Sequence, residues 1–202
     1  MEPFTLLRGK AVPMPRANIN TDDIISAQAM AGKVENIGEK LFTGARYDLN
    51  GAKRPDFILN TPRYDGSRIV LGGANFGCGS SREAVVWALT GYGIRCVIAP
   101  SFGEIFHDNS FQNGLLPLVL EESLVRTIIA SVERAAEPVM SVDLMRERIV
   151  PPDGPELPFS IPAERRAALL SGQDELDILL EHLGDLDRYR TTAPRRLWPA
   201  HG

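Results

Sequence analysis

Short apolar runs alternate with amphipathic segments between residues 68 and 138, and this alternation limits the possible folds more than any other feature of the chain. Runs typical of buried strands occupy residues 68–72, 96–99 and 116–120. Apolar residues recur at helical spacing at about residues 80–92, 101–112 and 124–137. Strands that alternate with helices form βαβ units, so the sequence predicts an α/β fold with a parallel sheet.

Weaker signals flank this region on both sides. We expect further strands at residues 6–12, 56–60, 139–143 and 148–150. Pro162 suits the first position of a helix that Gly172 ends, and a leucine-rich helix should begin near residue 174. The length of the chain and these signals predict one domain over residues 1–190, followed by a flexible, aperiodic tail over residues 191–202.

The composition excludes several classes of protein. Hydrophobic residues make up 44% and charged residues 24% of the 202 residues, which argues against disordered and fibrous chains. The net charge is −4 and the lysines and arginines are scattered, so we expect no nucleic-acid partner. No apolar run approaches the roughly 18 residues that cross a bilayer, and the first residues carry no signal-peptide pattern. We therefore expect a cytoplasmic protein without a membrane partner.

The two cysteines, Cys78 and Cys96, limit the cofactors that the chain can hold. They are too few for a disulfide scaffold, and too few to bind an iron–sulfur cluster through several thiolates. Cys96 lies in an apolar run and is predicted to be a buried core thiol. The histidines His107, His182 and His201 have no clustered partners and are predicted to be structural. We expect no metal site in this chain, so any cluster must come from elsewhere.

A glycine-rich segment at residues 72–83 carries the densest chemical signal. It lies between a predicted strand and a predicted helix, where glycines allow tight turns and free N–H groups at the helix start favour an anion. Arg82 adds a guanidinium that can hold a carboxylate in bidentate fashion, so a small di- or tricarboxylate suits this site. Spacing alone leaves a second interpretation open, because Ser80 and Glu83 also fit the S-x-x-E capping box that simply starts a helix.

Residues 75–83, which read Asn-Phe-Gly-Cys-Gly-Ser-Ser-Arg-Glu, resemble the signature of the 3-isopropylmalate dehydratase small-subunit family within the aconitase superfamily. The resemblance continues through residues 18–25, 55–62, 92–102 and 109–117, and more faintly through 172–182. It extends over nearly the whole chain up to about residue 190. The fold that it implies is a swivelling β/β/α domain, similar to the mobile fourth domain of aconitase.

The resemblance also implies an activity that the chain shares with a partner. Members of this family pair with a large subunit that holds a [4Fe-4S] cluster. The heterodimer isomerises 2-isopropylmalate and 3-isopropylmalate by dehydration and rehydration, in leucine biosynthesis. We therefore expect a hydro-lyase subunit that has no cofactor of its own, acts on a small hydroxy-dicarboxylate, and is active only in the complex.

Roles for individual residues follow from the same resemblance. The serine that matches Ser80 is the catalytic base, which takes a proton from carbon as an alkoxide. The positions expected to bind substrate are Ser81, Arg82, Thr21, Asp22, Gly79 and Lys33, and the last of these lies in the specificity loop at residues 26–36. Thr21 and Asp22 are expected to orient Arg82 or the substrate. Because a serine hydroxyl is a very weak acid, its anion needs stabilisation from helix N–H groups, the helix dipole or the Arg82 guanidinium.

Two departures from the family pattern keep other functions open. Ala84 stands where histidine is usual, and Ser26 stands where proline is usual. The chain could therefore instead be the small subunit of a related hydro-lyase, such as a citramalate, dimethylmalate or homoaconitate hydratase. A non-catalytic carboxylate-binding module is another alternative. A serine hydrolase would instead need His107 or His182 within hydrogen-bond reach of Ser80.

Overall fold

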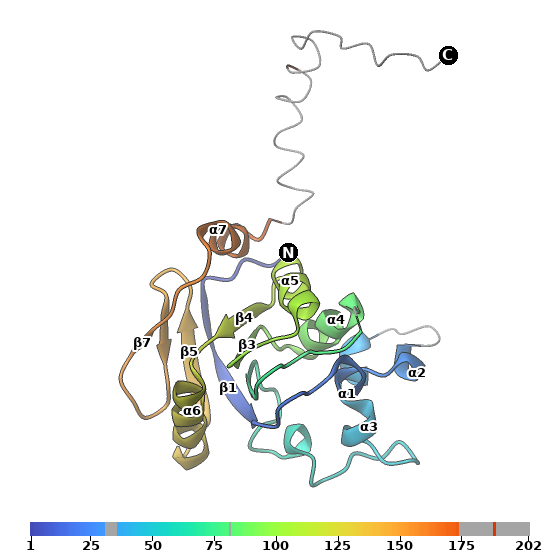
Figure 1. Cartoon of the computed structure of the whole chain (residues 1–202). Helices are drawn as coiled ribbons and strands as arrows, with labels where there is room; N and C mark the ends of the chain where they lie inside the picture. The colour runs from blue at the N-terminus through green and yellow to red at the C-terminus, as the bar shows by residue number, and fades with distance from the viewer. Residues whose placement is uncertain (31–35, 81, 174–187, 189–202) are drawn as a thin grey trace, which may run out of the picture.

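The computed structural model of the chain describes residues 1–30, 36–80, 82–173 and 188 (Figure 1). Its strands form one sheet in the order β4-β3-β2-β1-β5-β6-β7. The parallel half comprises β1 (Leu6–Met14), β2 (Ile69–Gly72), β3 (Cys96–Ala99) and β4 (Leu116–Val119). The antiparallel extension comprises β5 (Val139–Asp143), β6 (Arg148–Val150) and β7 (Leu157–Pro158).

The long strand β1 joins the two halves of the sheet. Its residues 6–10 pair antiparallel with β5, and its residues 11–14 pair parallel with β2. The burial of the strand follows this division, because exposed and buried side chains alternate over residues 6–8 whereas residues 11–14 are all buried. Antiparallel sheets commonly keep one solvent face, whereas parallel strands between helices are covered on both faces.

Helices pack around the sheet. The longer ones are α4 (Glu83–Tyr92), α5 (Glu104–Gln112), α6 (Glu122–Arg134) and α7 (Ala163–Ser171). The connection between β1 and β2 includes short helical turns, namely α1 (Thr21–Ile24), α2 (Ala27–Met30), η1 (Ile37–Lys40), α3 (Thr43–Arg46) and η2 (Ile58–Asn60). In Figure 1 the antiparallel strands and α6 occupy the left of the view, and α1 to α4 occupy the right.

The alternation predicted between residues 68 and 138 is confirmed, because β2, α4, β3, α5, β4 and α6 follow one another in that order. The first two helices, however, begin later than predicted, at Glu83 and Glu104. The residues ahead of these helices pair with other loops, since Cys78 forms a β-bridge with Asn20 and Phe102 forms one with Phe76. The bridge at Phe102 therefore lies within the first predicted turn of α5, whereas the bridge at Cys78 lies just ahead of the predicted start of α4.

The strand predicted at residues 56–60 is wrong, because residues 58–60 form the turn η2. The side-chain amide of Asn60 donates to the carbonyl groups of Arg46 at 2.7 Å and Arg54 at 2.8 Å, which holds the chain in a turn. Leu59 is fully buried by this turn. A short apolar run has no periodicity that separates a buried strand from a buried helical turn.

The core includes Cys96 on β3, whose side chain is fully buried, as predicted. Burial raises the pKa of this thiol, which keeps it protonated and unreactive. No helix in the described part of the chain is long and apolar enough to span a membrane. The leucine-rich helix expected from residue 174 and the tail at residues 191–202 lie outside the described residues, so the domain limits stay a prediction.

Candidate active site

Three loops meet at the carboxyl ends of β1, β2 and β3. The loop after β2, residues 73–82, is held between the other two by backbone hydrogen bonds. On one side, the N–H of Thr21 donates to the carbonyl of Cys78 at 2.8 Å. On the other side, the N–H of Gly103 donates to the carbonyl of Phe76 at 2.9 Å. Open α/β sheets bind ligands beyond the carboxyl ends of their strands, so a site is expected here.

Gly77 and Gly79 give this loop left-handed backbone conformations. Gly77 has a φ of +72°, and a Cβ there would lie 2.3 Å from Cγ of Phe106. The Phe106 ring packs edge-on against Phe76, with ring centroids 5.6 Å apart, and both side chains are buried beneath the loop. Gly79 has a φ of +105°, which other residues rarely adopt. The two glycines therefore let the loop turn sharply over an aromatic base.

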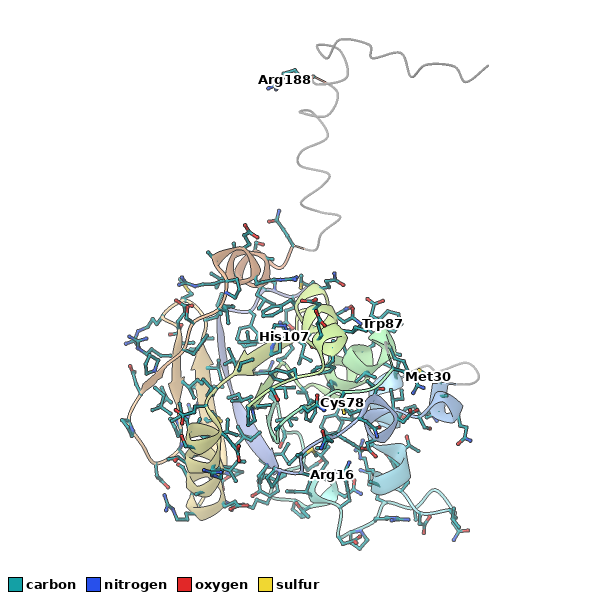
Figure 2. The ribbon with its side chains drawn as sticks, viewed as in Figure 1. Arg16, Met30, Cys78, Trp87, His107 and Arg188 are labelled. Carbon is teal, nitrogen blue, oxygen red and sulfur yellow. The ribbon has the colours of Figure 1, made fainter. Side chains whose placement is uncertain are left out.

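The loop borders a cavity of about 200 Å³. Its lining comprises Thr21 from α1, residues 77–80, Arg82 before α4, and residues 103–106 at the start of α5. Ser80 is exposed at this cavity and Cys78 is half-buried. Figure 2 shows Cys78 between α1 and α5, near the centre of the molecule. The cavity is large enough for a small ligand and places a serine hydroxyl at its mouth.

Arg82 is anchored beside this cavity by an ion pair. Its Nη1 atom contacts Oδ1 of Asp22 in the first turn of α1. The Arg82 side chain is 22% exposed, whereas that of Asp22 is 58% exposed. A guanidinium carries five N–H donors, so pairing through one nitrogen leaves donors for a bound carboxylate. The arrangement favours an anionic ligand.

The neighbouring Asp23 has a different structural task. It forms a capping box with Asn20: the Asp23 N–H donates to Asn20 Oδ1 at 2.8 Å, and the Asn20 N–H donates to Asp23 Oδ2 at 3.1 Å. The same carboxylate accepts a hydrogen bond from Arg16 at 2.6 Å. Asp23 thus fixes the start of α1, which presents Thr21 and Asp22 to the site.

The capping-box interpretation of Ser80 and Glu83 is wrong. Helix α4 begins at Glu83, and its N-cap residue is Arg82, whose side chain makes no capping hydrogen bond. The Glu83 carboxylate instead accepts a hydrogen bond from the side-chain amide of Asn113 at 3.0 Å. The glutamate of the predicted motif is thus hydrogen-bonded to a residue distant in the sequence. Ser80 lies ahead of the helix and is not its N-cap residue. The local spacing gives no sign of this contact.

The predicted site residues Thr21, Gly79, Ser80 and Arg82 all line the same cavity, and Asp22 reaches it through Arg82. Ser81 and Lys33 lie outside the described residues. The structure therefore brings five predicted residues together, and the chemical roles of all seven stay predictions.

Similarity to known proteins identifies the family to which the chain belongs. Residues 1–123 match the model of the aconitase C-terminal domain. The chain is 45% identical over 190 residues to the 3-isopropylmalate dehydratase small subunit of Rhodospirillum centenum, covering 94% of each chain. It is 42% identical over 200 residues to the small subunit of the same name from Agrobacterium fabrum, covering 98% of this chain and 100% of the relative. The chain belongs to the 3-isopropylmalate dehydratase small-subunit family.

A solved structure shows the same fold. It is titled 3-isopropylmalate dehydratase from Methanocaldococcus jannaschii and matches with a TM-score of 0.62 at 24% identity, covering 91% of this chain and 98% of the other. The resemblance and the fold class predicted from the sequence are therefore both confirmed.

The His107 side chain offers no support for a serine hydrolase within this family fold. His107 lies on α5 and packs against two aromatic rings. Its ring centroid is 5.8 Å from that of Phe102 and 5.1 Å from that of Phe111. Its Nδ1 lies 3.9 Å from Asp108. Burial lowers the pKa of His107, which favours a neutral ring packed among aromatic side chains. His182 lies outside the described residues.

Sequence reasoning missed the contribution of α5 to the site. Glu104, Ile105 and Phe106 line the cavity, although none of them belongs to a recognised motif. The signal that could have found them is topological: they follow β3, whose carboxyl end lies beside that of β2. A second, larger and mainly apolar cavity of about 550 Å³ begins at Asp22 and extends toward Phe42 and Phe57.

The side chains of the described residues do not fit an iron–sulfur cluster held by this chain. Such clusters are bound chiefly through several thiolates. Cys96 is fully buried with a raised pKa, and Cys78 is only half-buried at the cavity. Across the described ranges, no group of three or more His, Cys, Asp or Glu side chains is placed to hold a metal ion.

Proposed function

We propose that this chain is the small subunit of a 3-isopropylmalate dehydratase, a hydro-lyase that isomerises 2-isopropylmalate and 3-isopropylmalate by dehydration and rehydration in leucine biosynthesis. The observation that carries the proposal is the exposed Ser80 at a cavity that also holds the anchored Arg82. Full-length similarity to small subunits of that name supports the choice of reaction. The chain acts in the cytoplasm as one half of a heterodimer.

Ser80 is the catalytic base in this proposal. It removes a proton from the substrate carbon in one direction and returns it in the other. Its oxygen must carry negative charge, which the Arg82 guanidinium and the positive end of α4 stabilise. Helix α4 has ten residues and begins at Glu83, close after Ser80 in the chain, so its free N–H groups lie near the loop.

Arg82 binds a carboxylate of the substrate. Asp22 holds the guanidinium in place through Nη1, so the remaining donors are already oriented when the substrate arrives. Gly79 keeps the backbone beside Ser80 free of a side chain, and Ser81 and Lys33 complete the substrate contacts from this chain. A hydroxy-dicarboxylate suits this site, because Ser80 can act as the base and the fixed Arg82 guanidinium can bind a carboxylate.

The large subunit supplies the [4Fe-4S] cluster. When bound, the cluster provides a Lewis acid for the departing hydroxyl group. The present chain supplies the base, the carboxylate clamp and part of the wall of the site, and it contributes no ligand to the cluster. The site is therefore completed only when the two subunits meet.

Replacement of the proposed base tests this function. We expect Ser80→Ala, mixed with the cluster-loaded large subunit, to lower the turnover of 3-isopropylmalate by about a hundredfold to ten-thousandfold, the usual contribution of a general base. The measurement is the absorbance of the unsaturated intermediate. Ser123→Ala on the exposed face of α6 is the matched control and should retain wild-type activity. Unchanged activity of Ser80→Ala would contradict the proposed role.

The substrate itself needs a separate test because Ala84 replaces the usual histidine. Ala84 is half-buried in the first turn of α4, two residues after Arg82. Comparison of kcat/KM for isopropylmalate, citramalate, dimethylmalate and homoaconitate distinguishes the related hydro-lyases. Binding of these diacids without turnover by any complex would instead favour the carboxylate-binding module.

A further inference from the structure

The hydroxyl of Thr21 has no hydrogen-bond partner among the described residues, although it is buried. The residue is 3% exposed, and its Oγ1 atom is inaccessible and unpaired. Buried hydroxyl groups are normally hydrogen-bonded, because an unpaired one loses its bonds to water without replacement. An orphan of this kind in a cavity wall indicates a partner that is not in place in the isolated chain.

Other threonines of the protein show what Thr21 lacks. The hydroxyl groups of Thr43, Thr61, Thr90 and Thr127 each donate to a carbonyl three or four residues earlier in the chain, at 2.6, 2.7, 3.0 and 2.9 Å. Such local bonds are the ordinary solution for threonine in helical turns. Thr21 also begins a helical turn, yet its hydroxyl makes no bond of this kind.

The hydroxyl lies beneath the loop after β2, residues 73–82, which carries Ser80 and is called the serine loop below. A Cβ on Gly79 would be 3.2 Å from Thr21 Oγ1, so the hydroxyl faces the bare Cα of that glycine. The backbone N–H of Thr21 already donates to the carbonyl of Cys78 at 2.8 Å, which fixes the two segments relative to each other. The residue that follows Gly79 in the chain is Ser80, and both line the same cavity as Thr21.

We propose that Thr21 is a positioning residue whose hydroxyl donates a hydrogen bond to Ser80 Oγ when the large subunit completes the site. This inference rests on the proposed function. The hydroxyl is closed off from solvent under Gly79, so it is placed to meet an atom of the loop rather than a ligand entering the cavity. Ser80 is the loop residue that needs a donor, because its oxygen carries charge during the reaction.

Four charged or titratable groups surround this pair. Cys78 lies on the loop, Arg82 precedes α4, Asp22 lies on α1 and Glu104 begins α5. Of these, Arg82 is a hydrogen-bond donor, and it is shared with Asp22 and with the substrate carboxylate. A neutral donor from Thr21 would stabilise the Ser80 anion without competing for the substrate.

The pH dependence of the assembled enzyme tests the inference. Activity requires deprotonated Ser80, so kcat/KM rises with pH through the pKa of that group. A donated hydrogen bond lowers this pKa, and its loss in Thr21→Val should move the rising limb to higher pH by about one to two units. Thr21→Ser keeps the hydroxyl, so its kcat/KM should rise over the same pH range as that of the wild type. Thr90→Val on α4 should also leave this pH range unchanged. The KM of Thr21→Val should stay near the wild-type value.

Thermal unfolding of the isolated small subunit gives an independent readout. Removal of an unpaired buried hydroxyl should leave the Tm of Thr21→Val equal to or above that of the wild type. A lower Tm together with an unmoved pH limb would mean a structural role and overturn the inference. A raised KM with an unmoved limb would assign Thr21 to substrate binding and also overturn it. If the wild-type complex turns over no hydroxy diacid, the proposed function itself is overturned. If the complex is active and Ser80→Ala abolishes that activity, but Thr21→Val does not change it, only the present inference is overturned.

Discussion

At the scale of residues, the two adjacent aspartates of α1 divide the work of the site. Asp22 pairs with Arg82 at the cavity, and Asp23 caps the helix together with Asn20. Identical side chains at neighbouring positions thus have different partners, one a guanidinium at the cavity and the other the backbone at the start of the helix. The positions of Ser80 and Arg82 could be predicted because a contiguous motif carries them. The orphan hydroxyl of Thr21 could not, because burial depends on the loop that covers it.

Substitution of each aspartate separates these two tasks. We expect Asp22→Asn to lower kcat/KM of the complex by roughly ten- to a hundredfold, because the carboxylate clamp on Arg82 loses its fixed orientation. Its effect on unfolding should be small, since the Asp22 side chain is 58% exposed. Asp23→Asn carries the same charge change on the same helix. Its amide oxygen can still accept from the Asn20 N–H, so α1 should keep its place and the kinetics should stay near the wild type. Equal kinetic defects in the two variants would contradict this assignment.

At the scale of elements, the order of strands and helices between residues 68 and 138 was predictable, whereas the starts of the helices were not. The apolar periodicity that predicts α4 and α5 is a local property of the sequence. The residues ahead of them form the bridges Asn20–Cys78 and Phe76–Phe102, which join segments far apart in the chain and leave no sign in the local pattern. The turn η2 could not be predicted for a similar reason, because the side-chain amide of Asn60 donates a hydrogen bond to the backbone carbonyl of Arg46, which is distant in the sequence.

The serine loop should be intolerant of a side chain at Gly77. Gly77→Ala combines a left-handed φ of +72° with a contact of 2.3 Å to Phe106, whereas Gly51 has a φ of +81° and nothing within 4 Å of its Cβ position. Gly51→Ala should therefore cost about 1–2 kcal/mol from backbone strain alone. Gly77→Ala should cost roughly 1–3 kcal/mol more, from the steric overlap with the ring. Denaturant unfolding of the isolated subunit measures both, and equal costs would mean that the loop does not rest tightly on Phe106.

At the scale of the whole molecule, the sheet places the proposed half-site on one edge of the fold. The loops of the parallel half carry Ser80 and Arg82, and β5 to β7 extend the sheet away from them. The number of cysteines already predicted that a cluster must come from another chain. The shape of the contact with that chain was not predictable, because it depends equally on a second sequence.

A half-site of this kind makes an inactive small subunit a competitor of the active one. Ser80→Ala removes the base but leaves the backbone and the rest of the surface intact, so it should bind the large subunit as the wild type does. With limiting large subunit, an equal concentration of Ser80→Ala and wild-type small subunit should reduce the turnover of 3-isopropylmalate to about half, by simple mass action. The active control Ser123→Ala should leave the rate unchanged in the same mixture. A rate insensitive to excess Ser80→Ala would show that the variant does not occupy the partner, and the loss of activity in that variant would then reflect failed assembly rather than a missing base.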